Sequence, residues 1–178
     1  MALINTTTTG VLGSTFYGDG TGSLTVQQNG VTQGIYGNIP AFQAYRTSDQ
    51  TITTSTFTKV TLNAEVFDTN NNFDTTLNRF TPTIAGYYQI SHLISAFNST
   101  TPTRLLTTIY KNGSQHSYGS DSTITTGISS GGNSVLIYFN GTTDYVELYA
   151  YITAGTAVVS TLGSPIYTHL CGFLAKAT

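Results

Sequence analysis

Three histidines, one cysteine and a cluster of acidic and amide side chains are the residues of this chain that could do chemistry. His92, His116 and His169 are isolated from one another and lack the spacing of metal ligands. No paired histidines with a carboxylate occur at metal-binding intervals, which disfavours a jelly-roll enzyme such as a cupin or hydrolase. Cys171 lies in the apolar run 169–174 and is predicted to be a small buried hydrophobic residue. We therefore predict no catalytic residues, no metal and no cofactor.

Two further segments resemble ligand-binding loops. Asp68 and Asp74 flank the amides of residues 70–72, and such an oxygen-rich loop could bind calcium, but capping of the loop's own backbone is favoured. The glycine-rich segment 18–22 superficially suggests a phosphate cradle. It is interpreted as a flexible turn, because neither a lysine nor a helical pattern follows it.

Tyrosines form a stripe in the segment 144–151, where residues alternate between two sides. Tyr145, Tyr149 and Tyr151 share one side with Glu147, while the opposite side is apolar. The stripe could contact glycans or pack against neighbouring subunits, and packing is favoured.

Composition excludes several classes of partner. The 178 residues are 39% hydrophobic but only 8% charged, with a net charge of −2. Six scattered Lys and Arg residues cannot neutralise a row of phosphates, so no nucleic acid is expected. No segment approaches the ~20 apolar residues of a membrane span. Residues 1–6 carry no positive charge, which argues against a secretory signal.

Residues 1–39 differ from the rest of the chain, because frequent glycines leave no room for long elements. Segment 23–27 alternates like a strand, Asn29-Gly30 is a favoured hairpin turn, and a return strand can begin at 31–32. We interpret this region as an N-terminal arm that needs a docking partner. A frayed tail or an edge hairpin of the same domain is the alternative.

Residues 40–178 are predicted to form one all-β domain, rich in the aromatic and β-branched residues that suit strands. Phe57, Val60, Leu62 and Val66 are the expected inward side chains of the second strand. Turns are expected at 68–72, 111–113, 130–133 and 140–141, the last opening a hairpin. The spacing predicts a jelly-roll β-sandwich of about 8–10 antiparallel strands. The clearest strands are expected at 40–45, 56–67, 79–82, 85–97, 104–110, 134–139, 144–151 and 167–174.

The segment 62–92 resembles the signature of the complement C1q globular head and its tumour necrosis factor-like relatives. Asp68, Phe73, Phe80, Gly86 and Tyr88 fall in register with the family pattern. The resemblance extends over residues 40–176, with 111–113, 134–136 and the closing segment 171–174 as weaker matches. Three family aromatic positions are replaced, by Leu62, Ile90 and His92.

The resemblance implies a trimer in which aromatic strands face inward, and a protein that binds rather than catalyses. We expect a homotrimer. His92 is expected to be packed or to face the trimer axis. The candidates for core or trimer packing are Phe80, Tyr88, Ile90, His92, Tyr149 and Phe173.

A Gly/Thr-rich arm joined to a trimeric β head, with few charges, is typical of bacteriophage virion proteins; this is an analogy of fold and composition. The first hypothesis is a capsid decoration (cement) protein on the outer capsid surface. Its arm would dock on the major capsid protein. The alternative is the receptor-binding tip of a tail fibre that recognises host surface glycans.

Overall fold

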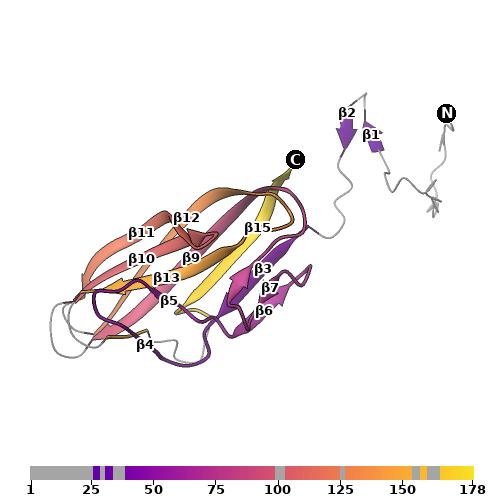
Figure 1. The fold of residues 1–178 in the computed structure, drawn as a ribbon. Coiled ribbons are helices and arrows are strands. Elements are labelled where there is room, and N and C mark those ends of the chain that lie inside the picture. The colour runs from indigo at the N-terminus through magenta and orange to yellow at the C-terminus, as the bar shows by residue number, and fades with distance from the viewer. Residues whose placement is uncertain are drawn as a thin grey trace. The chain divides into compact units, whose positions relative to one another are not determined.

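Strands are the regular elements of this computed structural model (Figure 1). The chain divides into two compact units, residues 1–37 and 38–178. In the first unit, β1 (Val26–Gln28) and β2 (Val31–Gln33) pair antiparallel, as expected for the hairpin, while its Asn29-Gly30 turn lies outside the described residues. The role of residues 1–39 as a docking arm stays a prediction. The structure describes residues 26–28, 31–33, 39–98, 103–124, 127–153, 157–159 and 165–178.

The larger unit contains a seven-stranded antiparallel sheet built around its longest strands. β9 (Gly86–Asn98) pairs along its whole length with β12 (Gly127–Phe139) on one edge. Its other edge pairs with β15 (His169–Ala177) and then with β14 (Ala157–Val159). The remaining members are β3 (Ala41–Tyr45), β6 (Ala64–Asp68) and β4 (Gln50–Ile52).

A six-stranded sheet forms the other layer. β10 (Thr103–Lys111) lies between β11 (Ser114–Ile124) and β13 (Val146–Ile152). The β10–β11 hairpin turns at Asn112 and Gly113, whose φ values of 52° and 75° are the left-handed pair that a tight hairpin requires. The shorter members are β8 (Arg79–Phe80), β7 (Phe73–Asp74) and β5 (Thr58–Lys59).

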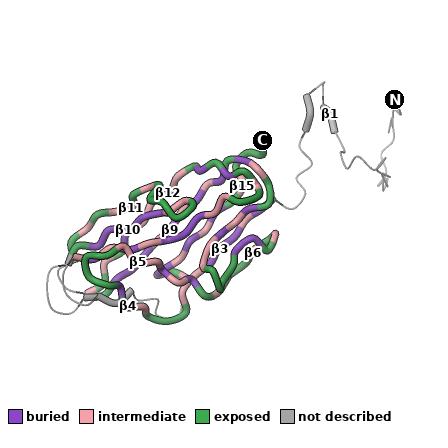
Figure 2. The backbone as a smooth tube through the Cα atoms, viewed as in Figure 1, coloured by how far each residue is buried: buried purple, intermediate pink, exposed green. Residues whose placement is uncertain are grey.

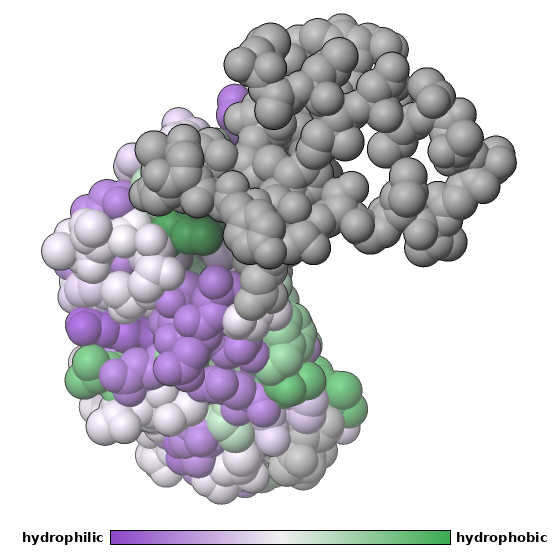
Figure 3. Space-filling model, turned by 90° about the vertical axis from the view of Figure 1, so that its right-hand side faces the viewer, coloured by the Kyte–Doolittle hydropathy of each residue, from purple (hydrophilic) through white to green (hydrophobic). Residues whose placement is uncertain are grey.

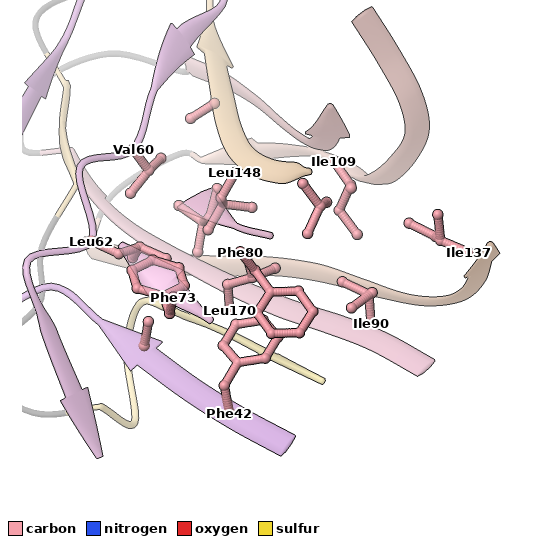
Figure 4. Close-up of a cluster of buried hydrophobic side chains, with 14 of the residues drawn as sticks. Phe42, Val60, Leu62, Phe73, Phe80, Ile90, Ile109, Ile137, Leu148 and Leu170 are labelled. Atoms are coloured by element: carbon pink, nitrogen blue, oxygen red, sulfur yellow. The ribbon is translucent and has the colours of Figure 1, made fainter. Parts of the chain in front are cut away.

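The two sheets pack face to face and bury an aromatic core between them (Figure 4). Buried positions alternate with half-buried or exposed ones along the strands, as the two-residue period of a strand dictates (Figure 2). Phe80 stacks on Phe42 at 4.0 Å between ring centroids and meets Tyr88 edge-on at 5.7 Å. The prediction of an all-β jelly-roll sandwich is confirmed. Short strands of two or three residues raise the number above the eight to ten expected.

One expected strand is in fact two. The segment 56–67 was expected to be continuous, but β5 pairs with β13 in one sheet and β6 pairs with β3 in the other. Val60 and Leu62, between them, point into the core as expected. The prediction that Val66 points inward is wrong. Val66 lies at the β3–β6 register shift, and its side chain is 51% exposed. The bulge changes the alternation on which the prediction depended.

The predicted break at 130–133 is also wrong, because β12 runs through it without interruption. Gly132 lies so close to β9 that a Cβ atom there would come within 2.2 Å of the His92 carbonyl oxygen. The Ser120 hydroxyl donates to the Gly132 carbonyl at 3.1 Å, which ties β11 to β12 across the two sheets. Gly132 therefore permits close packing of β12 against β9 and β11 at one edge of the sandwich, and it does not end the strand.

The expected hairpin at Asn140-Gly141 does not form. The strands on either side, β12 and β13, belong to different sheets, so the loop crosses the sandwich. The Asn140 side-chain oxygen accepts hydrogen bonds from the backbone N–H groups of residues 142, 143 and 144. Asparagine here caps a crossover loop, which the Asn-Gly dipeptide alone does not distinguish from a hairpin turn.

The other edge of the sandwich is formed by β6 and β7, which are joined by the predicted turn at 68–72. Asp68 accepts hydrogen bonds from the backbone N–H groups of Asn70 and Phe73, and Asn71 has a φ of 55°. Both Asp68 carboxylate oxygens are therefore used within the turn, in agreement with the loop-capping interpretation.

Candidate functional site

The outward face of the seven-stranded sheet is the most unusual surface of the head. Strand register places alternate residues of β3, β9, β12 and β15, together with Phe67 of β6, side by side on it. Tyr138 thus lies opposite Tyr87, and Leu136 opposite Gln89. We call this surface the outward face. Its largest side chains, each between 43% and 56% exposed, are Phe67, Tyr87, Phe97, Ile128, Leu136, Tyr138 and Phe173.

Charge is nearly absent from the outward face. Among the described outward residues of these four strands, only Lys176, opposite Tyr87 near the end of β15, is a lysine, arginine or acidic residue. Polar groups between the hydrophobic side chains are already hydrogen-bonded to one another. The Gln89 amide donates to the Ser134 hydroxyl at 2.6 Å, and the Ser91 hydroxyl lies 2.6 Å from the same Ser134 hydroxyl. Covering this face therefore requires little desolvation of charged groups.

Aromatic side chains form a tyrosine pair and line a depression on the outward face. Tyr87 and Tyr138 contact each other at 5.5 Å between ring centroids. Phe67 and Phe173 line a depression of about 240 Å³, where Cys171 is also found. Cys171 is half-buried rather than buried as predicted, and burial raises the pKa of its thiol. Phe97 and Ile128 pair at one end of β9 and β12, and Tyr87 and Tyr138 at the other, with serines between them. Exposed aromatic side chains with few charges among them are typical of a protein–protein interface.

The residues selected from the sequence do not form one site. Phe80, Tyr88 and Ile90 lie in the core between the sheets, and His92 is buried beside it. Phe173 lies on the outward face. Tyr149 lies in β13 of the other sheet, where it stacks on Tyr110 at 3.9 Å.

The remaining tyrosines of the predicted stripe are held by contacts within the chain. Tyr151 packs against Phe57 at 5.0 Å, and Tyr145 lies under the Arg79 guanidinium at 4.5 Å. Glu147, on the same strand, forms an ion pair with Lys59 at 2.5 Å.

Sequence reasoning missed the tyrosine and leucine side chains of the outward face, although a signal was present. Residues 135–139 are apolar without alternation. Such a run indicates a strand that is covered on both faces, and only one face is covered by the chain's own core.

His92 is a buried neutral imidazole. It is 4% exposed, its Nε2 lies 2.9 Å from the Thr107 hydroxyl, and its Nδ1 has no hydrogen-bond partner. Burial, assisted by the nearby His169, lowers the pKa of His92 from 6.5 to about 4. At neutral pH the ring therefore packs without charge.

We expect this histidine to make the fold acid-sensitive. Below pH 6.5 the unfolded chain binds a proton that folded His92 accepts only near pH 4, so the free energy of unfolding should fall between these values. The shift corresponds to about 3 kcal/mol at most. Urea unfolding at pH 7.5 and 4.5 measures the change, and His92→Gln should reduce it. His116→Gln, at an exposed position, serves as the control, and an equal reduction in both variants would contradict the assignment.

The sequence contains two segments that resemble ligand-binding loops but were not expected to bind, at 68–74 and 18–22. Within the described residues, no group of three or more His, Cys, Asp or Glu side chains could hold a metal ion. The predicted turn at 18–22 lies outside the described residues. No helix in the described part of the chain is long and apolar enough to cross a membrane.

The head is similar in fold to solved structures of two related kinds. The globular domain of zebrafish complement 1qA protein matches with a TM-score of 0.56 and 15% identity, over 78% of this chain and 99% of that one. Murine APRIL at pH 5.0 matches with a TM-score of 0.55 and 10% identity, over 76% and 98% of the two chains. The Eiger TNF from S. frugiperda matches with a TM-score of 0.53 and 10% identity, over 79% and 93%.

At these identities the likeness establishes the fold alone: the head is a C1q/TNF-like jelly roll. No protein-family model matches the chain. No curated protein matches it either.

Proposed function

We propose that the protein is a homotrimer whose subunits cover one another's outward faces. The observation that carries this proposal is the uncharged, aromatic outward face, whose seven large side chains remain half exposed in a single chain. A ring of three heterologous contacts covers such a face on every subunit. A permanent interface of this kind buries on the order of 2,000 Å² or more. The resemblance to C1q and TNF-like heads favours three copies.

The trimer's role, we propose, is structural and not enzymatic: it is a capsid decoration (cement) protein on the outer surface of a bacteriophage particle. Two features support this role. The chain has a separate N-terminal unit in addition to the head, and only 8% of its residues are charged. Three linked N-terminal segments would bind the major capsid protein with avidity, because each bound segment raises the effective concentration of the others.

Removing residues 1–39 tests the docking role. We expect the truncated chain to remain a soluble trimer, because every strand of the two-sheet head lies beyond residue 39. It should no longer bind purified capsids in a co-sedimentation assay, whereas the full chain does. Normal capsid binding by the truncated head would contradict docking through this segment.

Copy number distinguishes the two virion roles. A decoration protein should be present in several hundred copies per particle, measured by quantitative mass spectrometry against the major capsid protein. A handful of copies would instead indicate the tip of a tail fibre, for which direct binding to host surface glycans is expected.

A further inference from the structure

A polar cleft of about 510 Å³ opens at the edge of the sandwich formed by β6 and β7. Its volume is within the range of small-molecule sites. Figure 3 shows a broad hydrophilic area on the head from the side at which these strands lie in Figure 1, bordered by hydrophobic side chains. The polar side chains that form its walls are Glu65, Asn72, Asp74, Arg79, Thr81 and Thr83.

Two of these side chains bury N–H groups that have no acceptor. Asn72 is only 7% exposed, and its Nδ2 has no hydrogen-bond partner, although its side-chain oxygen accepts from the Thr83 hydroxyl at 3.4 Å. The Nε of Arg79 is also buried without a partner. Buried donors without acceptors destabilise a protein. Both side chains line the cleft, so a ligand that inserts between them would give these N–H groups an acceptor.

The Arg79 guanidinium is held in place by an aromatic ring. It lies over Tyr145 at 4.5 Å from the ring centroid, a contact that fixes its plane without using its N–H groups. On β7, opposite Arg79, Asp74 accepts hydrogen bonds from the backbone N–H groups of Thr76 and Leu77 through one oxygen, Oδ1. The cleft therefore presents fixed donors and acceptors that its own loops do not fully use.

The chemistry of the walls indicates the class of ligand. Hydroxyl, amide, carboxylate and guanidinium groups together supply both donors and acceptors, which match sugar hydroxyls because each hydroxyl donates and accepts. Two carboxylates against one guanidinium disfavour an anionic ligand, and the guanidinium disfavours a metal cation. We infer that the cleft binds a neutral saccharide, with Arg79 and Asn72 as donors and Glu65 and Asp74 as acceptors.

This saccharide site is separate from the outward face and does not depend on trimer formation or capsid docking. The two surfaces share no lining residue, although β6 contributes to both: Phe67 lies on the outward face beside Gln43, whereas Glu65 lines the cleft. A trimeric head that displays three such clefts would bind a multivalent glycan surface with avidity.

Titration of the ¹⁵N-labelled full chain tests the inference, with lactose, maltose and N-acetylglucosamine as neutral probes. We expect at least one of them to shift the amide resonances of residues 71–75 and 79–83 saturably. Arg79→Lys keeps the charge but removes the planar fork, and it should weaken binding about tenfold. Arg104→Lys, at the exposed ion pair with Asp121, is the matched control and should bind like the parent chain.

Thr83→Ala provides a second variant at an exposed position, and it should also weaken binding. Glucuronate and calcium chloride are the competing probes. The inference is overturned if no neutral saccharide shifts these resonances, or if glucuronate or calcium alone does. It is also overturned if Arg79→Lys and Thr83→Ala bind as tightly as the control.

Discussion

A single acidic side chain on the outward face is expected to convert the proposed trimer into monomers. Leu136 is 56% exposed in one chain and lies on the edge strand β12, opposite Gln89, which is followed across the sheet by Phe173. Neither of these side chains carries a charge that could pair with an introduced carboxylate. Leu136→Asp would bury an unpaired charge at each of the three contacts. The penalty is about 3 kcal/mol or more per contact, which weakens each more than a hundredfold.

Light scattering coupled to size-exclusion chromatography measures this change directly. The measured mass of the parent protein should be three times that of a single chain, whereas the mass of Leu136→Asp should equal that of a single chain. Leu77→Asp is the matched control, because Leu77 is 46% exposed but lies in the turn between β7 and β8, away from the outward face. Circular dichroism should show β structure in both variants. A trimeric Leu136→Asp, or dissociation of both variants, would refute the assignment of the interface.

Phe80→Ala should cause the largest loss of stability of any core substitution considered. Phe80 is fully buried, stacks on Phe42, and contacts Tyr88 and Phe139 edge-on. Truncation removes the contacts of Phe80 with three aromatic rings of the opposite sheet and leaves a cavity between the two sheets. We expect a loss of about 3–5 kcal/mol in the free energy of unfolding.

Urea unfolding at a fixed protein concentration checks this value, because the stability of the proposed trimer would depend on concentration. Phe80→Leu keeps most of the volume and should cost about 1.5 kcal/mol or less. Val66→Ala, at a position that is 51% exposed, should change stability by less than about 0.5 kcal/mol. Similar losses for Phe80→Ala and Val66→Ala would contradict the central role of Phe80 in the core.

The parts of the fold that were predictable from the sequence are those in which the local pattern and the tertiary contacts agree. The strand expected at 85–97 is β9, Gly86–Asn98, because its alternating apolar residues face the core. The turn at 68–72 formed as expected because Asp68 bonds its own backbone. Both features need only residues that are neighbours in sequence.

The parts that were missed depend on distant partners. β11, Ser114–Ile124, contains few strand formers, and its pairing with β10 and its side-chain contacts with β12 stabilise it. The polar cleft could not be recognised either, since Asn72 and Arg79 become neighbours only when β7 pairs with β8. The chain crosses between the sheets at 140–144 because β13 pairs with β10 and not with β12, and the residues of the loop do not determine that choice.

The near absence of charge on the outward face has a consequence for the salt concentrations that the proposed trimer tolerates. Coulombic contacts weaken as ionic strength rises, whereas contacts between uncharged aromatic and aliphatic surfaces do not, and salting-out ions strengthen them. Subunits joined through Tyr87, Leu136 and Phe173 would therefore stay associated from fresh water to brine. If the proposed role on a capsid is correct, the decorated particle would tolerate both dilute and saline media.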